Sequence, residues 1–206
     1  MAINTLAPQG LLFSRNVLTN APTFQANSYT MLKSYATKIG LGDVVSTGTA
    51  GNLGYVTLSA DGAGAILGVF AGVEPYYDLN LQQTVFTQWW TGTQNPSADA
   101  GCKVIDDPNV AFRAQVSGGP AVLGWRGKNI DWTYGGATGG NGAPNIAGIS
   151  TLGLNGASVA TTNTLPFRVM GVVGITGGPQ DPANTNPWIE VVMNPGIAER
   201  GQSLGI

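Results

Sequence analysis

The sequence predicts a mainly β protein, with a single β-barrel or β-sandwich core, an extended N-terminal arm and a Gly-rich insertion. Between residues 38 and 116, five or six short apolar runs are separated by Gly, Asp and Asn, a pattern typical of strands joined by turns. Gly accounts for 31 of 206 residues, which favours turns and extended chain. Only 10% of residues are charged, so this is either an ordinary neutral β protein or one that other subunits cover.

Two domains of unequal character are expected. Residues 1–34 carry Phe13, Phe24 and Tyr29 among Asn, Thr, Pro and Gln, without a sustained helical or strand period. We interpret them as an extended arm that buries these rings on a neighbouring subunit, with a short helix near residues 28–35 or a frayed terminus as the alternatives. Residues 35–206 form the barrel or sandwich domain.

The expected strands follow in order along this domain. They are residues 35–39, 43–47, 54–59, 65–73, 81–90, 102–105, 110–116, 165–175 and 187–193. The segments 54–59 and 65–73 are expected to pair as a hairpin, because Asp61-Gly62 lies between them. The strand 65–73 is apolar on both faces, which predicts that it is covered on both sides.

Two further patterns predict which side chains face the core. In the strand 110–116, Val110, Phe112 and the next alternate residues should face inward, and Ala111, Arg113 and Gln115 outward. Trp89 and Trp90 are adjacent, so they should point to opposite faces of their strand.

An insertion is expected at about residues 118–164, where Gly and Asn are frequent and the segment GGATGGNGAPN occupies residues 135–145. Trp125, Trp132 and Tyr134 lie within it. Three large aromatic residues in an unstructured loop would expose an apolar patch, so partial order is expected.

Composition argues against several classes of partner. The formal net charge is −2 and the nine Lys and Arg are scattered, so nucleic-acid binding is not expected. No basic leader precedes an apolar run near residue 1, and the apolar stretch 63–73 is short, so neither a secretory signal nor a membrane span is predicted. Cys102 is the only cysteine and is expected to be buried in a protein made in a reducing cytoplasm.

No catalytic, cofactor or metal site is predicted. The chain contains no His, which removes the commonest general base and metal ligand. Asp106 and Asp107 are predicted to form a turn before Pro108, and a Ca²⁺ site is the minor alternative. An enzyme that uses a pair of carboxylates distant in the sequence, with Asp99, Asp106 or Asp107 as one member, is the alternative hypothesis.

Several segments together resemble a group of tailed-phage head proteins. They are GDVV at residues 42–45, GVFAG at 68–72, a Trp that ends the next strand, VIDDPNVAFRAQV at 104–116, ATTNTLPFRVMGVV at 160–173 and WIEVVMN at 188–194. The resemblance covers roughly residues 35–195, and 104–116 is its most specific part. The Gly-rich segment 135–145 and the loop 176–187 depart from it.

The resemblance implies a minor virion protein of the capsid decoration (cement) type. Such a protein would lie on the outer surface of the icosahedral head, as a homotrimer at local three-fold positions, and bridge neighbouring major capsid subunits after the shell expands. It would need no enzyme activity and no cofactor.

The residues expected to make these contacts are aromatic. They are Phe13, Phe24 and Tyr29 of the arm, one of Trp89 and Trp90, and Trp125 or Trp132. A carbohydrate-binding or fibre-type surface module is the alternative, because it also combines β structure with exposed Trp.

Overall fold

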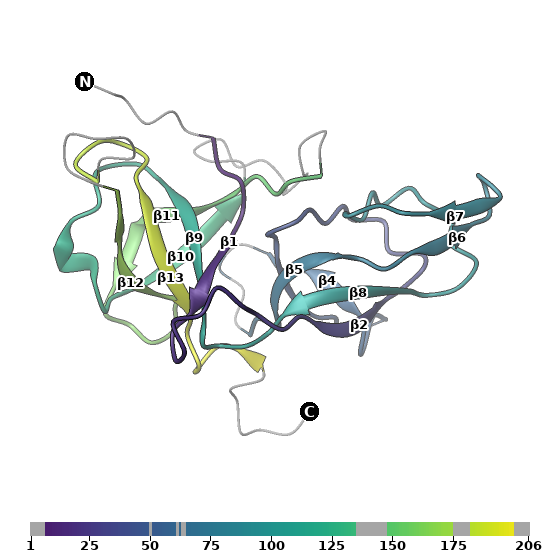
Figure 1. The fold of residues 1–206 in the computed structure, drawn as a ribbon, viewed down its shortest axis with the longest axis horizontal. Helices are drawn as coiled ribbons and strands as arrows, with labels where there is room; N and C mark the ends of the chain where they lie inside the picture. The colour runs from purple at the N-terminus through teal and green to yellow at the C-terminus, as the bar shows by residue number, and fades with distance from the viewer. Residues whose placement is uncertain are drawn as a thin grey trace.

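The protein is built from β-strands that form a closed five-stranded barrel, a five-stranded sheet beside it and a separate two-stranded hairpin (Figure 1). The computed structural model describes residues 7–49, 51–60, 62, 65–134, 148–174 and 182–199. The mainly β fold predicted from the sequence is thereby confirmed.

The strands are short, and a single 3₁₀ turn interrupts them in the described part of the chain. Their bounds are β1 (Leu12–Asn16), β2 (Asn27–Met31), β3 (Val44–Thr47), β4 (Val56–Leu58), β5 (Gly68–Val73), β6 (Tyr76–Asp78), β7 (Gln83–Val85), β8 (Ala100–Ile105), β9 (Val110–Ser117), η1 (Leu123–Trp125), β10 (Asn129–Tyr134), β11 (Leu152–Ala160), β12 (Phe167–Val173) and β13 (Trp188–Met193).

The barrel closes through β9, which pairs with strands on both of its edges. The ring runs β9-β11-β10-β12-β13 and returns to β9. All of its pairings are antiparallel except the short parallel one between β11 and β9. Strand β1 pairs with the first half of β9, on the edge that β11 takes over further along. Closure leaves no free edge within this ring.

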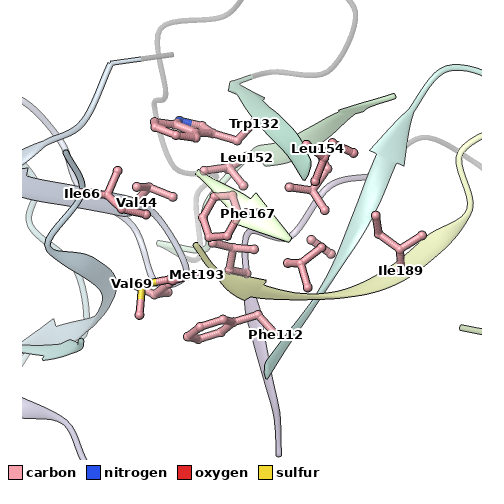
Figure 2. Close-up of a cluster of buried hydrophobic side chains, with 14 of the residues drawn as sticks. Val44, Ile66, Val69, Phe112, Trp132, Leu152, Leu154, Phe167, Ile189 and Met193 are labelled. Atoms are coloured by element: carbon pink, nitrogen blue, oxygen red, sulfur yellow. The ribbon is translucent and has the colours of Figure 1, made fainter. Parts of the chain in front are cut away.

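Large side chains from every barrel strand fill its interior. Figure 2 shows Phe112, Trp132, Leu152, Leu154, Phe167 and Ile189, each at most 1% exposed. The rings of Trp132 and Phe167 meet edge to face, with centroids 5.9 Å apart. These residues recur at every second position of their strands, as side chains on the inner face of a barrel must.

The second sheet has the order β2-β8-β5-β3-β4, and one of its faces packs against the barrel. Val44 and Val69 belong to the same buried cluster as the barrel interior (Figure 2). The adjacent residues, Val45 and Phe70, point to the other face and join a smaller cluster around Trp90. The strand 65–73 is therefore covered on both sides, as its two apolar faces predicted.

The expected hairpin between residues 54–59 and 65–73 is wrong. Strand β4 pairs with β3, and β3 lies between β4 and β5. Because β5 is apolar on both faces, burial favours the central position between β3 and β8 for it. The expected strand 81–90 is also shorter: only β7 within it is a strand, and it belongs to the separate hairpin with β6.

The N-terminal segment is part of both sheets, which corrects the expected boundary at residue 35. Strand β1 pairs with β9 of the barrel, and β2 pairs with β8 of the second sheet. No helix forms near residues 28–35, because Asn27–Met31 is extended and pairs with residues 100–104 of β8. Residues 1–6 lie outside the described part.

The expected insertion at 118–164 is corrected as well. Strands β10 and β11 fall within it, and both are members of the barrel ring. Gly and Asn in this region made it resemble a loop, yet Ile130, Trp132 and Leu154 alternate into the core. The segment 135–145 lies outside the described residues.

The barrel and the second sheet meet at the turn of residues 40–43. Leu41 pairs with Ile149 just before β11, and the Gly42 carbonyl accepts a hydrogen bond from the Leu11 N–H at 3.0 Å. Gly42 has φ +85°, and a Cβ there would lie 2.9 Å from the Leu11 nitrogen, so the backbones approach too closely for a side chain.

Asp43 closes this turn with a fully buried carboxyl group. Its Oδ2 accepts the Gly40 N–H at 2.6 Å, while Oδ1 has no hydrogen-bond partner. Burial raises the pKa of Asp43 to about 7; the neighbouring Ser150 hydroxyl opposes the rise without reaching hydrogen-bond geometry with Oδ1, and the Gly40 N–H opposes it too. The carboxyl is therefore protonated in the folded protein below neutral pH.

This burial predicts a pH-dependent stability that the substitution Asp43→Asn removes. The unfolded carboxyl ionises near pH 4 and the folded one near pH 7, so stability falls as pH rises across this window. The loss is on the order of 4 kcal/mol. The asparagine side chain keeps an acceptor for the Gly40 N–H and stays neutral at every pH. Denaturant unfolding between pH 4 and 8 should show a decline for the natural chain relative to the variant; parallel profiles would contradict this.

Candidate interaction surface

The carboxylates that sequence reasoning singled out have structural roles. Asp106 is buried and accepts hydrogen bonds from Asn27 Nδ2 at 2.8 and 3.1 Å and from the Tyr29 hydroxyl at 2.6 Å. It thereby ties β2 to the end of β8. Asp107 accepts the Asn109 N–H at 2.9 Å, as the predicted turn requires.

Among the residues that the structure describes, the third candidate carboxylate, Asp99, shares no hydrogen-bond partner with Asp106 or Asp107. It accepts the Lys33 N–H at 2.9 Å and the Tyr55 hydroxyl at 2.9 Å. Within the described ranges, no group of three or more His, Cys, Asp or Glu side chains is placed to hold a metal ion.

One cleft between the second sheet and the chain near residue 199 contains two carboxylates, Asp106 and Glu199. Glu199 accepts the Thr47 N–H at 3.0 Å and also the Thr47 hydroxyl. Asp106 therefore joins β2 to the end of β8, and Glu199 joins the chain near residue 199 to β3, so the cleft lies between segments that are distant in the sequence.

The seven aromatic residues expected at interfaces are distributed differently from the prediction. Trp90 and Trp132 are buried in the two cores, with 0% and 1% exposure, so they are packing residues. The Trp90 Nε1 donates to the Tyr35 carbonyl at 2.7 Å, which satisfies the polar atom of a buried indole. Trp89 lies half-buried against Gly148, where a Cβ would meet its ring. The two adjacent Trp side chains thus differ in burial, as their alternation predicted.

The other four aromatic residues are not fully buried. The rings of Phe13 and Phe24 contact each other at a tilt of 47°, with centroids 4.5 Å apart, and Phe24 remains 46% exposed. Tyr29 is half-buried over Asp106, and Trp125 is half-buried against the barrel core. Of the seven, Phe24 alone leaves close to half of its surface free.

A different apolar surface lies on the β6–β7 hairpin. Tyr77, Leu79, Leu81 and Phe86 are 46%, 49%, 60% and 81% exposed, and we call these four residues the hairpin surface. The hairpin extends beyond the second sheet at one end of the molecule (Figure 1). An exposed group of large apolar side chains with polar neighbours is typical of a protein–protein contact site.

Internal contacts hold this hairpin in place. The Asp78 Oδ1 accepts the N–H groups of Asn80 and Leu81 at 2.8 and 3.1 Å, and its Oδ2 accepts that of Asn95 at 3.1 Å. Desolvation raises the pKa of Asp78, but these N–H groups outweigh it and the net pKa is lowered, so the carboxylate stays ionised. On the inner face, the Tyr76 ring packs 6.1 Å from that of Trp90.

The hairpin surface is free of charge. Asp78 is the only Asp, Glu, Lys or Arg among residues 75–98, and its side chain is turned inward with 3% exposure. Charged residues are depleted in the cores of protein interfaces, whereas most free surfaces carry them. The rim is formed instead by amides and hydroxyls, such as those of Gln83 and Thr84.

A second apolar surface surrounds η1. Val122 and Leu123 are 52% and 81% exposed, and we call them the turn surface. They border a groove lined also by Pro120, Ala121, Val172, Gly174, Pro182 and Ala183. Because η1 packs on β12 of the barrel, the turn surface lies at the opposite end of the molecule from the hairpin (Figure 1).

Sequence reasoning did not find the hairpin surface. It assigned residues 81–90 to a core strand and looked for contacts among Trp residues. The available signal was the absence of charge over residues 79–98 together with Leu and Phe placed among Asn and Gln. That combination suits neither a solvated loop nor a buried strand.

No protein family model, curated protein or solved structure matches the chain. Among the described residues, no helix has the length and apolar character needed to cross a membrane. The function is therefore inferred from the residues and the geometry.

Cys102 should be unreactive in the folded protein. It is fully buried on β8, and burial raises the pKa of its thiol to about 12, with Glu74 adding to the rise. A disulfide reagent at pH 8 should release no thiol signal from the native chain within minutes and one equivalent after denaturation. Rapid labelling of the native chain would contradict this placement, and Cys102→Ala supplies the blank.

Proposed function

We propose that the chain is a structural virion protein that decorates the outer surface of a tailed-phage head and cements neighbouring major capsid subunits. The observation that carries the proposal is the pair of exposed apolar surfaces, one of them uncharged, at opposite ends of one strand-built body. A molecule that joins two neighbours needs two separate contact surfaces and a body that holds them apart.

The body is suited to this role because its core runs through both halves. Val44 and Val69 of the second sheet pack with Phe112 and Phe167 of the barrel (Figure 2). Close-packed interiors deform little, so the two ends would keep a constant separation. Force applied to one contact surface would then be transmitted to the other.

Two further observations support a structural role. The candidate carboxylates Asp99, Asp106 and Asp107 are engaged in hydrogen bonds that join or cap strands. The segments 104–116 and 160–173 resemble tailed-phage head proteins, and they contain most of β9 and all of β12, two strands of the barrel ring.

The proposed mechanism is mass action. A protein that binds only the assembled, expanded shell stabilises it by an amount that rises with the logarithm of its free concentration relative to its Kd. Self-association into the expected homotrimer, and repetition over many symmetry-related positions, would multiply weak contacts into a large total stabilisation. No cofactor or chemical step is required.

The exposed aromatic residues give little support to the fibre-type or carbohydrate-binding alternative. A sugar platform needs an exposed aromatic ring, and the five Trp residues are all buried or half-buried. Of the exposed aromatic rings, Phe24 lies beside Phe13 of β1, and Tyr77 and Phe86 lie on the hairpin, where no exposed charged side chain of residues 75–98 accompanies them.

Co-sedimentation tests the proposal directly. Purified protein is mixed with expanded heads of the phage that encodes it, assembled without it, and in parallel with unexpanded heads. We expect saturable binding to expanded heads at a fixed ratio to the major capsid subunit, with raised resistance to heat. Absence of binding to both shells would overturn the proposal, and glycan arrays would then test the alternative.

The hairpin surface should supply part of this binding. Leu81→Ser and Phe86→Ser should each weaken binding to expanded heads about ten-fold, because burying a large apolar side chain stabilises a complex by about 1.5–3 kcal/mol. Leu53→Ser is the matched control, since Leu53 is 75% exposed in the β3–β4 turn. Equal binding by all three variants would place the contact elsewhere on the molecule.

A further inference from the structure

The hairpin has one occupied and one free edge. The outer edge of β6 is bonded to the chain after β7: the Tyr77 carbonyl accepts the Ser97 N–H at 2.9 Å, and the Leu79 N–H donates to the Asn95 carbonyl at 2.8 Å. Strand β7 pairs with β6 alone in the part of the chain that the structure describes. The outward edge of β7 is therefore open.

The register identifies the backbone groups on this open edge. Tyr77 lies opposite Thr84, and Tyr76 and Asp78 lie opposite Val85 and Gln83. Because the carbonyl of Tyr77 points away from β7, the pair Tyr77–Thr84 is the non-hydrogen-bonded one. The N–H and C=O of Thr84 accordingly point outward from the hairpin, away from β6.

This edge lacks the charged residues and prolines that commonly protect exposed strands from pairing. No Lys, Arg, Asp or Glu lies between residues 79 and 98, and no proline lies between 76 and 95. The strand has only three residues, so one added strand would gain few hydrogen bonds. A short open edge suits a contact that is weak singly and repeated many times.

The exposed side chains lie where an added strand would meet them. Tyr77 and Thr84 are cross-strand neighbours, so their side chains share the outward face of the hairpin. Leu81 and Phe86 flank β7 on its two sides in the chain. A strand laid along β7 would therefore gain backbone hydrogen bonds from Thr84 and apolar contact from the residues around it.

We infer that β7 is a strand-addition site for an extended, uncharged segment of the major capsid subunit. This inference rests on the proposed function, and it names the element of the hairpin surface that makes the contact and the manner of binding. Main-chain pairing supplies affinity in such complexes, and the apolar side chains select the partner segment.

The occupant is the shell protein and not a second copy of this chain. The absence of charge on residues 79–98 matches a segment that is itself uncharged, since a charged one would lose water without gaining a partner. Pairing of β7 with β7 of another copy would join two molecules end to end and consume both hairpins. Neither hairpin would then remain available to a capsid subunit.

The test compares Thr84→Pro with Thr84→Val. Proline removes the outward N–H and leaves the hydrogen bonds of Gln83 and Val85 to β6 in place, because edge positions tolerate proline. Valine keeps the N–H and the size of the side chain. Both variants should unfold at the temperature of the natural chain. Thr84→Pro should weaken binding to expanded heads at least ten-fold, and Thr84→Val should bind normally.

Hydrogen exchange on the natural chain gives a second measurement that needs no variant. The Thr84 amide should exchange rapidly in the free protein and become protected on expanded heads, while the amides of Gln83 and Val85 are protected in both states. An unchanged Thr84 amide on heads that have bound the protein would overturn strand addition, even if Thr84→Pro fails to fold.

The remaining outcomes separate this inference from the proposed function. Normal binding by Thr84→Pro, with loss of binding by Phe86→Ser, would overturn strand addition and leave decoration intact. Failure of the natural chain to bind any head would overturn the proposed function itself. Concentration-dependent dimers in sedimentation velocity that Thr84→Pro abolishes, with unchanged head binding, would assign β7 to a second copy and overturn the shell protein as its occupant.

Discussion

The pairing of β9 with other strands along both of its edges is the constraint on which the rest of the structure depends. Strand β13 pairs along one edge, and β1 followed by β11 pairs along the other, so β9 closes the barrel and anchors the N-terminal segment. It follows β8 of the second sheet after a turn of four residues, 106–109, which Asp107 and Asn109 stabilise. The connection between the barrel and the second sheet is therefore short, and the shared apolar core that it brings together fixes their arrangement.

The distribution of charge follows from this architecture and from the surfaces that it leaves open. One ion pair joins the edge strand β1 to β13, between Arg15 and Glu190, whose Nη2 and Oε2 atoms are 2.8 Å apart. The hairpin carries a single carboxylate, and that group binds the N–H groups of its own turn. A surface that is to meet another protein gains from the scarcity of charge, because buried charges must otherwise be paired. Low overall charge and exposed apolar ends therefore fit the same role.

The sequence alone was sufficient for those features that local pattern determines. Alternation in residues 110–116 correctly placed Phe112 and Val116 inside, and the apolar segment 65–73 correctly predicted a strand covered on both faces. It failed for Ala111, which is fully buried where β9 lies between β1 and β13. It failed for Gln115, which is buried because Asn186 and Ala7 satisfy its amide from distant parts of the chain. Sequence pattern also failed for β10 and β11, because the Gly and Asn content of this region is typical of a loop. These two strands depend on pairing partners that are distant in the sequence and that barrel closure brings together.

By itself, then, the sequence determined the β class of this protein, the positions of most strands and the absence of His, since period, turn residues and composition are local properties. Tertiary structure decided that β3 separates β4 from β5, that Trp90 and Trp132 belong to cores, and that Leu81 and Phe86 stay outside. The physical reason is that strand order and side-chain burial depend on contacts between residues far apart in the chain. Such contacts are selected by the packing of the whole molecule, and no short stretch of residues encodes them alone.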